Sequence, residues 1–143
     1  MKVFVDTNII IDLLCTREPF AKDAAEIFKM GYEKRIDLYL SSLTVINAIY
    51  VCRKYGYNNS DIIISLKKLC SFCNVTSIGS NEIHESFSSS GSDFEDMVQL
   101  HSAVASGADC IVTRDKTGYE LSPIQVFEPK EFINHLFFAL KKS

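Results

Sequence analysis

The stretch Val3-Phe4-Val5-Asp6-Thr7-Asn8, followed by an isoleucine- and leucine-rich run at 9–14, decides the fold. Its β-branched and aromatic start predicts a short strand, which the polar triplet Asp6-Thr7-Asn8 ends. The apolar residues that follow predict a helix. The chain therefore opens with a strand that passes directly into a helix.

Strands and helices continue to alternate along the chain. We expect further strands at 38–40, 75–78, 110–112 and 125–127, and further helices at 19–31, 43–54, 60–69, 82–87, 93–106 and 128–141. Pro19 suits the first turn of its helix, and the serine-rich stretch 88–92 is expected to be a loop. The alternation implies an α/β fold with a mainly parallel central sheet and helices on both faces.

Length and composition predict one globular domain over residues 1–143. The chain is 47% hydrophobic and 23% charged, a composition that excludes disordered, collagen-like and coiled-coil proteins. Its net charge of -3 argues against nucleic-acid binding through the overall charge of the protein. No apolar run approaches the roughly 20 residues that span a bilayer, and no secretory signal is apparent, so we expect a cytoplasmic protein without a membrane partner. The isolated pair Cys70 and Cys73 is expected to be structural.

Acidic residues follow or precede the expected strands at positions that share one edge of the sheet. They are Asp6 after the first strand, Asp93, Glu95 and Asp96 at the start of a helix, and Asp115 in Thr113-Arg114-Asp115. Ligands of open parallel sheets bind outside the carboxyl ends of the strands. Carboxylates gathered there would raise a pKa or recruit a cation. Oxygen ligands without paired His or Cys favour Mg²⁺ or Mn²⁺, which suits hydrolysis of phosphodiesters.

Each acid also has a structural interpretation. Asp6 or Asn8 could cap the helix that follows. The pattern Ser92-x-x-Glu95 is a capping box, which gives Glu95 a structural role. Asp93 either meets the helix dipole in the first turn or is itself the cap. Asp96 lies one turn beyond Asp93 on the same face and is harder to explain structurally.

Four motifs, in order over nearly the whole chain, resemble those of the PIN domain. They are Val3-Phe4-Val5-Asp6-Thr7-Asn8, Ser41-Ser42-Leu43-Thr44 heading a helix, Asp96 before an alanine-containing helix, and Ile111-Val112-Thr113-Arg114-Asp115. The resemblance implies a three-layer α/β/α sandwich and Mg²⁺- or Mn²⁺-dependent cleavage of RNA, as in the ribonuclease toxins of toxin–antitoxin pairs. It would make RNA the substrate and an antitoxin protein a possible partner.

The resemblance also assigns roles to individual residues. The implied metal ligands and catalytic acids are Asp6, Asp96 and Asp115. The implied supporting residues are Asn8, Thr113 and, as an extra ligand, Asp93.

Asn47 departs from the pattern, because the family usually has a Glu in the helix after the second strand. Asn is a poor helix former, and the neighbours of Asn47 at helical spacing are the apolar residues Leu43, Tyr50 and Val51, so we expect it to face inward and to need a partner. It then either contacts the metal site or is a core amide satisfied by backbone groups. The loss of one anion leaves a catalytically impaired RNA-binding or protein-interaction module as the alternative function.

Other features of the sequence give weaker indications of function. A haloacid-dehalogenase-type phosphatase would need an acid at position 8, where Asn8 stands, and a Rossmann domain would need a glycine-rich turn after the first strand. His101 points off the acid face and is expected to have a packing or surface role. Three cations near the acids either meet phosphate or are solvated: Arg17, Arg114 and Lys116. The apolar surplus of the last helix indicates core packing or a contact with a homodimer or another partner.

Overall fold

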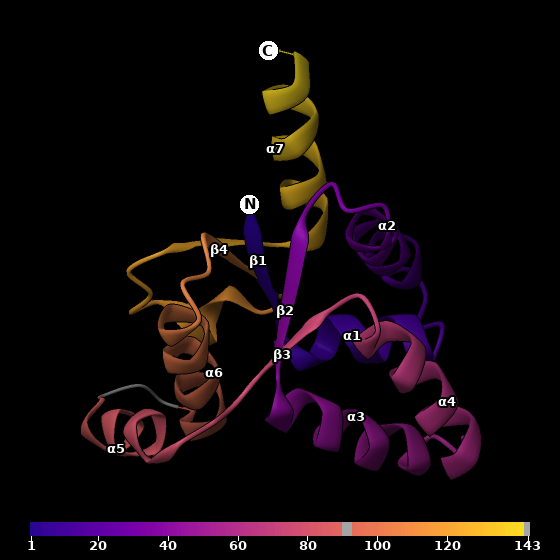
Figure 1. Ribbon diagram of the computed structural model, residues 1–143, viewed down its shortest axis with the longest axis horizontal. Coiled ribbons are helices and arrows are strands. Elements are labelled where there is room, and N and C mark those ends of the chain that lie inside the picture. The colour runs from indigo at the N-terminus through magenta and orange to yellow at the C-terminus, as the bar shows by residue number, and fades with distance from the viewer. Residues whose placement is uncertain (90–92, 142–143) are drawn as a thin grey trace.

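The computed structural model describes residues 1–89 and 93–141, and within them five strands form one parallel sheet (Figure 1). The strands are β1 Lys2–Val5, β2 Asp37–Ser41, β3 Asn74–Thr76, β4 Cys110–Val112 and β5 Gln125–Phe127. Their order in the sheet is β3-β2-β1-β4-β5, and every neighbouring pair is parallel. The predicted parallel α/β fold is confirmed.

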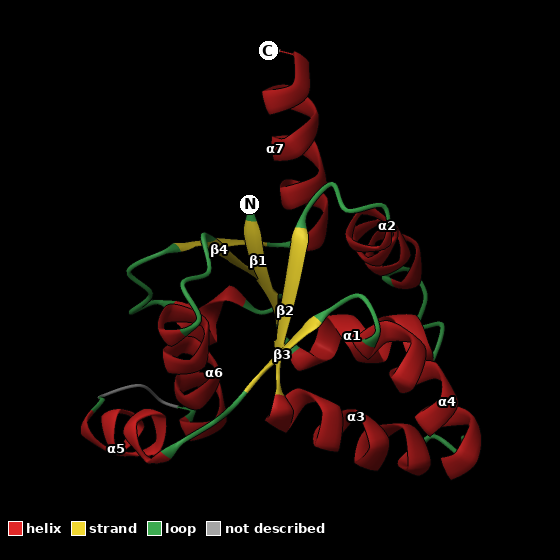
Figure 2. Cartoon of the chain, in the orientation of Figure 1, coloured by secondary structure: helices red, strands yellow, loops and turns green. Residues whose placement is uncertain are grey.

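Helices cover both faces of this sheet, which completes the three-layer sandwich (Figure 2). They are α1 Thr7–Leu14, α2 Ala21–Tyr32, α3 Ser42–Lys54, α4 Asn59–Cys70, α5 Ser80–Ser88, α6 Phe94–Ala105 and α7 Pro129–Lys141, with a short 3-10 helix at Lys116–Tyr119. Figure 1 shows α1 to α4 on one side of the sheet and α5 and α6 on the other, while α7 projects beyond it. No helix in the described part of the chain is long and apolar enough to cross a membrane.

Side-chain alternation along the central strands explains the two layers. Val3 and Val5 pack into one core with residues of α1 to α4, whereas Phe4 packs into a second core with residues of α6. All three side chains are fully buried. A central parallel strand covered on both faces has this continuous apolar character, and the opening motif of the chain therefore specifies a strand at the middle of the sheet.

Several boundaries differ from the sequence expectations. Pro19 lies before α2 rather than in its first turn, because the N–H groups of Phe20 and Ala21 both bond to the carbonyl of Arg17 and complete a turn there. The helix expected at 60–69 begins one residue earlier, since the Asn58 side chain caps it. The expected loop at 88–92 is described only at its first two residues, which end α5; 90–92 lie outside the described residues.

The strand order places a topological switch point where the candidate site lies. From β1 the chain builds outward through β2 and β3, and it then returns to β4 on the other side of β1. Such a switch point parts the loops that leave the two strands and favours ligand binding at their carboxyl ends. Asp6 leaves β1 at this point, and Thr113 leaves β4.

Candidate active site

Asp6 is buried between β1 and α1, with both carboxylate oxygens hydrogen-bonded. One accepts the Thr7 N–H at 2.7 Å and so caps α1; the other accepts the Thr113 hydroxyl at 2.9 Å and, at 3.4 Å, the Asn8 amide. Burial raises the pKa of Asp6, while the Thr113 and Thr7 hydrogen bonds oppose the rise. The predicted cap and the predicted site residue are therefore the same carboxylate.

Thr113 joins the ends of the two central strands. Its hydroxyl donates to Asp6 and accepts from the Asn8 amide at 3.3 Å and from the Asp115 N–H at 3.2 Å. Asn8 also accepts the Arg114 N–H at 3.4 Å. These bonds fix Asp6 relative to the loop after β4, so the structure brings Asn8 and Thr113 to the acids as expected.

Asp96 is half-buried in the first turn of α6, and its pKa is strongly perturbed. Burial and the charges of Asp6, Asp93, Asp115 and Glu95, in that order, raise its pKa to about 7. Among the described residues no Lys, Arg or His forms an ion pair with Asp6 or Asp96. Two crowded carboxylates therefore lack a cation supplied by these parts of the chain.

Asp93 has a different task from Asp96. It is exposed, and its carboxylate accepts the Asp96 N–H at 3.1 Å as the N-cap of α6. The interpretation of Asp93 as the cap is confirmed. Its charge still contributes to the raised pKa of Asp96, so Asp93 affects the site through the field rather than through a contact that the structure shows.

The 3-10 helix closes over Asp96. A Cβ at Gly118 would lie 2.7 Å from the Asp96 Cγ and still closer to one carboxylate oxygen. Only glycine allows the backbone to approach this closely. The neighbouring Tyr119 is buried, and its hydroxyl has no hydrogen-bond partner of good geometry within the described ranges 1–89 and 93–141.

Tyr119 lies close enough to the acids to be affected by them. Burial first, and then the charges of Asp6 and Asp96, raise the pKa of its hydroxyl. A buried hydroxyl without a partner costs free energy and calls for an explanation such as a bound water or ion. The Tyr119 hydroxyl interacts with the Asp6 carboxylate and helps to lower its pKa, and a hydroxyl without good hydrogen-bond geometry beside two carboxylates that lack a countercharge fits a site for a hydrated cation.

Asp115 follows β4 as predicted, but its carboxylate is turned to its own loop. It is exposed and bonds to the N–H of Thr117 at 3.1 Å and to the Thr117 hydroxyl, and these bonds lower its pKa. In the described parts of the chain, no three Asp, Glu, His or Cys side chains are grouped as a ready cation site. The structure thus places Asp6 and Asp96 innermost and Asp115 at the rim.

Asn47 lies beside this cluster rather than in the core. It is half-buried, and its amide donates to Glu95 at 2.7 Å. The interpretation of Asn47 as a core amide satisfied by backbone groups is wrong, because its partner is a carboxylate on α6. Ser92, the other residue of the capping box expected for Glu95, lies outside the described residues.

Sequence reasoning missed Gln99, which aligns the helices of the site. Its fully buried amide donates to the hydroxyls of Thr7 at 3.0 Å and Thr44 at 2.8 Å, and its carbonyl accepts the Ser41 hydroxyl at 2.6 Å. Gln99 thereby ties α6 to α1, α3 and the end of β2. The available signal was a polar residue one turn after Asp96 in an otherwise apolar helix.

It also missed Asp12, which determines what the nearby arginines do. The buried Asp12 carboxylate pairs with Arg114 through contacts of 2.5 and 3.1 Å, and with Arg17 at 3.8 Å. Lys116 pairs with Glu131 at 2.8 Å. Each of these three cations is paired with an acid of this chain, while the side chains of Arg17 and Lys116 stay partly exposed to solvent.

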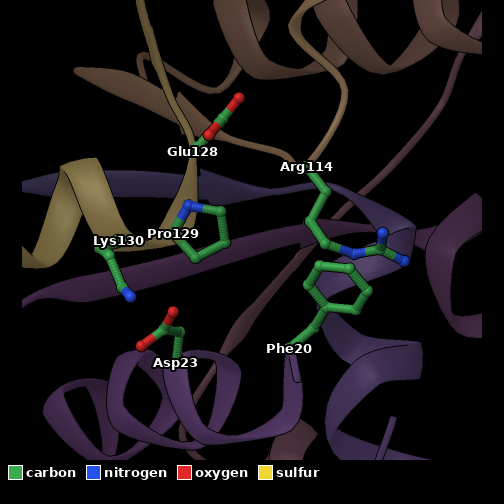
Figure 3. A pocket seen from close by; sticks show the side chains of 6 residues that line it. All are labelled: Phe20, Asp23, Arg114, Glu128, Pro129 and Lys130. Carbon is green, nitrogen blue, oxygen red and sulfur yellow. The ribbon is translucent and has the colours of Figure 1, made fainter. Parts of the chain in front are cut away.

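A cavity of about 320 Å³ lies next to Arg114, outside the acid cluster (Figure 3). Its lining comprises Phe20, Asp23, Arg114, Glu128, Pro129 and Lys130. The Arg114 guanidinium stacks on the Phe20 ring at 3.9 Å. The lining carries two acids and two cations, so its charge does not favour an anionic ligand.

Other expectations can be judged from contacts. His101 bonds through one ring nitrogen to Glu85 at 3.0 Å and through the other to Ser89 at 2.9 Å, so it links α5 to α6 in the structural role that we expected. Cys70 and Cys73 are free thiols, which agrees with the expectation of reduced structural cysteines.

The parallel α/β/α sandwich with acids at the β1–β4 switch point is the architecture of PIN domains. The PIN domain family profile matches residues 2–117, and the chain belongs to that family.

Individual relatives agree with this assignment. The chain is 26% identical over 137 residues to Ribonuclease VapC1 of Aquifex aeolicus, with 92% of each chain covered. Its fold is similar to that of FitAcB from Neisseria gonorrhoeae (TM-score 0.66, 15% identity, 90% of this chain and 98% of that chain). It is also similar to that of a toxin–antitoxin complex from Klebsiella pneumoniae (TM-score 0.63, 21% identity, 89% and 97%).

Proposed function

We propose that this chain is a Mg²⁺- or Mn²⁺-dependent endoribonuclease that hydrolyses RNA phosphodiester bonds. The observation that carries the proposal is the crowding of Asp6 and Asp96 without a countercharge from the described residues. Membership of the PIN domain family and the similarity to Ribonuclease VapC1 support the same reaction.

The residues that would hold the cation are Asp6, Asp96 and Asp115. When bound there, the cation would activate water and stabilise charge on the leaving oxygen. The chain's own residues provide the fixed frame for this chemistry. Thr113 and the N-terminus of α1 hold the Asp6 carboxylate, and Gln99 fixes α6, and with it Asp96, against α1 and α3.

We propose that RNA is the substrate and that a small antitoxin protein is the partner. The name Ribonuclease VapC1 and the toxin–antitoxin complex from Klebsiella pneumoniae support both. The exposed side chains of Phe137 and Phe138 on α7, a helix that projects from the sandwich (Figure 1), support a protein contact there.

Cleavage of a labelled single-stranded RNA with and without Mn²⁺ tests the proposal. We expect cleavage that requires the cation and that Asp96→Asn reduces by more than the 10- to 100-fold typical of partners outside the ligand shell. The matched control is Asp61→Asn, which neutralises an exposed acid of α4 and should leave the rate unchanged. RNA binding without cleavage at any Mn²⁺ concentration would instead establish the catalytically silent binding module.

A further inference from the structure

Glu95 and Asn47 form a contact that the proposed reaction does not yet use. The Asn47 amide on α3 donates to the Glu95 carboxylate on α6 at 2.7 Å, so the bond joins two helices that Figure 1 places on opposite sides of the sheet. Both residues lie beside the acid cluster, since Glu95 adjoins Asp96 in the first turn of α6. The two side chains thus meet between α3 and α6, next to Asp96.

We propose that Glu95, held in place by Asn47, is a further acid of the cation site, so that α6 rather than α3 supplies this negative charge. The inference rests on the proposed function, whose cation site it completes. Asn47 is then a positioning residue. Its amide restrains the Glu95 side chain, which would otherwise extend into solvent. The entropic cost of this restraint is little more than the lost rotamer freedom of one exposed side chain.

Three observations separate Glu95 from its neighbour Asp93. Asp93 uses its carboxylate to cap α6, whereas Glu95 bonds across to α3. Burial, the charge of Asp93 and then the charge of Asp6 raise the pKa of Glu95, so Glu95 shares the charge of Asp6 with Asp96. The charge of Glu95 also contributes to the raised pKa of the buried Tyr119 hydroxyl, after the charges of Asp6 and Asp96. Glu95, bonded to Asn47, therefore interacts electrostatically with the inner acids.

A matched pair of isosteric variants tests this assignment by calorimetric titration with Mn²⁺ alone. Glu95→Gln keeps an oxygen that can accept the Asn47 amide but removes the charge, and Asp93→Asn keeps a side chain that can cap α6. We expect Glu95→Gln to weaken Mn²⁺ binding about 10- to 100-fold, the range typical of residues that support a metal ligand. Asp93→Asn should weaken Mn²⁺ binding less than Glu95→Gln does, because the exposed Asp93 carboxylate is held at the N-cap of α6, although its charge also raises the pKa of Asp96.

The double variant Asn47→Glu/Glu95→Gln moves the negative charge back across the same hydrogen bond. If the location of the charge is what matters, this variant should recover most of the affinity that Glu95→Gln loses. Asn47→Ala, which keeps the charge but frees it, should lose part of the affinity. Metal-free melting curves of all variants confirm folding, since both side chains lie at the surface of their helices.

The outcomes are distinct. Equal Mn²⁺ affinity of wild type and Glu95→Gln, or equal losses in Glu95→Gln and Asp93→Asn, would overturn the inference, as would a wild-type chain that does not bind Mn²⁺. RNA cleavage is scored separately: a chain that binds Mn²⁺ with the expected variant pattern but cleaves no RNA refutes the proposed ribonuclease and leaves the assignment of Glu95 intact.

Discussion

Acids in two places near the end of the sheet invite comparison: Asp12 alone, and Asp6 together with Asp96. They differ in whether positively charged side chains pair with them. Asp12 is 1% exposed and Asp6 is 7% exposed, and burial raises the pKa of each. Asp12 is met by Arg114 and Arg17, whose charges oppose that rise. Asp6 instead faces the carboxylate of Asp96, whose own pKa is raised by it.

The difference separates a structural from a functional role on physical grounds. A buried charge paired with guanidinium groups stabilises the fold only as long as the pair is complete. Like charges that face each other destabilise the fold unless something outside the chain neutralises them. Asp12 therefore links α1 to the loop after β4 through its ion pairs. Asp6 and Asp96 instead form the proposed site for a cation from outside the chain. Neutralising one acid of each group should have opposite effects on stability.

The largest effect is expected from Asp12→Asn. The substitution leaves two guanidinium groups without their buried partner and should lower the free energy of unfolding by about 3 kcal/mol, as broken buried pairs do. Chemical denaturation at neutral pH measures the change. Asp61→Asn is the control on an exposed acid and should stay within about 0.5 kcal/mol of wild type. A loss of stability for Asp12→Asn no larger than that of the control would show that these ion pairs do not stabilise the fold.

The next effect is the response to cation. Millimolar Mn²⁺ at a hundredfold excess over its dissociation constant should stabilise the wild-type chain by about 2.7 kcal/mol. Asp6→Asn should lose most of this gain, while Asp12→Asn, although less stable, should keep it. Melting temperatures with and without Mn²⁺ give both values. If Mn²⁺ leaves the melting temperature of the wild-type chain unchanged, the unpaired acids are not a cation site.

The same comparison shows what could be read from the sequence. Asp6 and Thr113 could be predicted because each directly follows a recognisable strand, and parallel strands end at one edge. Asp12 could not be assigned, since its partner Arg114 lies 102 residues away and only the fold brings them together. The Asn47–Glu95 bond spans 48 residues and involves a position that local rules assign to a capping box. Local patterns specify strands, helices and caps, whereas pairing across the sheet depends on tertiary geometry.

The turn that contains Tyr119 is a second example of a feature whose role depends on tertiary contacts and cannot be read from the local sequence. Nothing in the sequence near 116–119 distinguishes an ordinary turn from one that packs against the carboxylate of Asp96. The contact of Gly118 with Asp96 shows that this turn closes onto the site. The sequence carried a glycine at the required position, but without the position of α6 no reason for it could be given.

The smallest effect is the pH dependence of the metal-free chain. The folded pKa of Asp96 is raised from its ordinary 3.8 to about 7, so the folded state binds a proton that the unfolded state releases throughout that interval. Stability should therefore fall as the pH rises from about 4 to about 7 and change little from this group above it. Because Asp96 is half-exposed, solvent screening reduces the change to about 1–2 kcal/mol.

Asp96→Asn isolates this contribution, because the variant has no proton to lose. The difference in free energy of unfolding between wild type and Asp96→Asn should grow from near zero at about pH 4 to its full value near pH 7, with the variant the more stable. Saturating Mn²⁺ should remove the slope, since the bound cation neutralises the site in place of the proton. A difference that is constant across this range would mean that Asp96 is not crowded by the neighbouring acids, and the contrast with the compensated Asp12 would then have to rest on Asp6 alone.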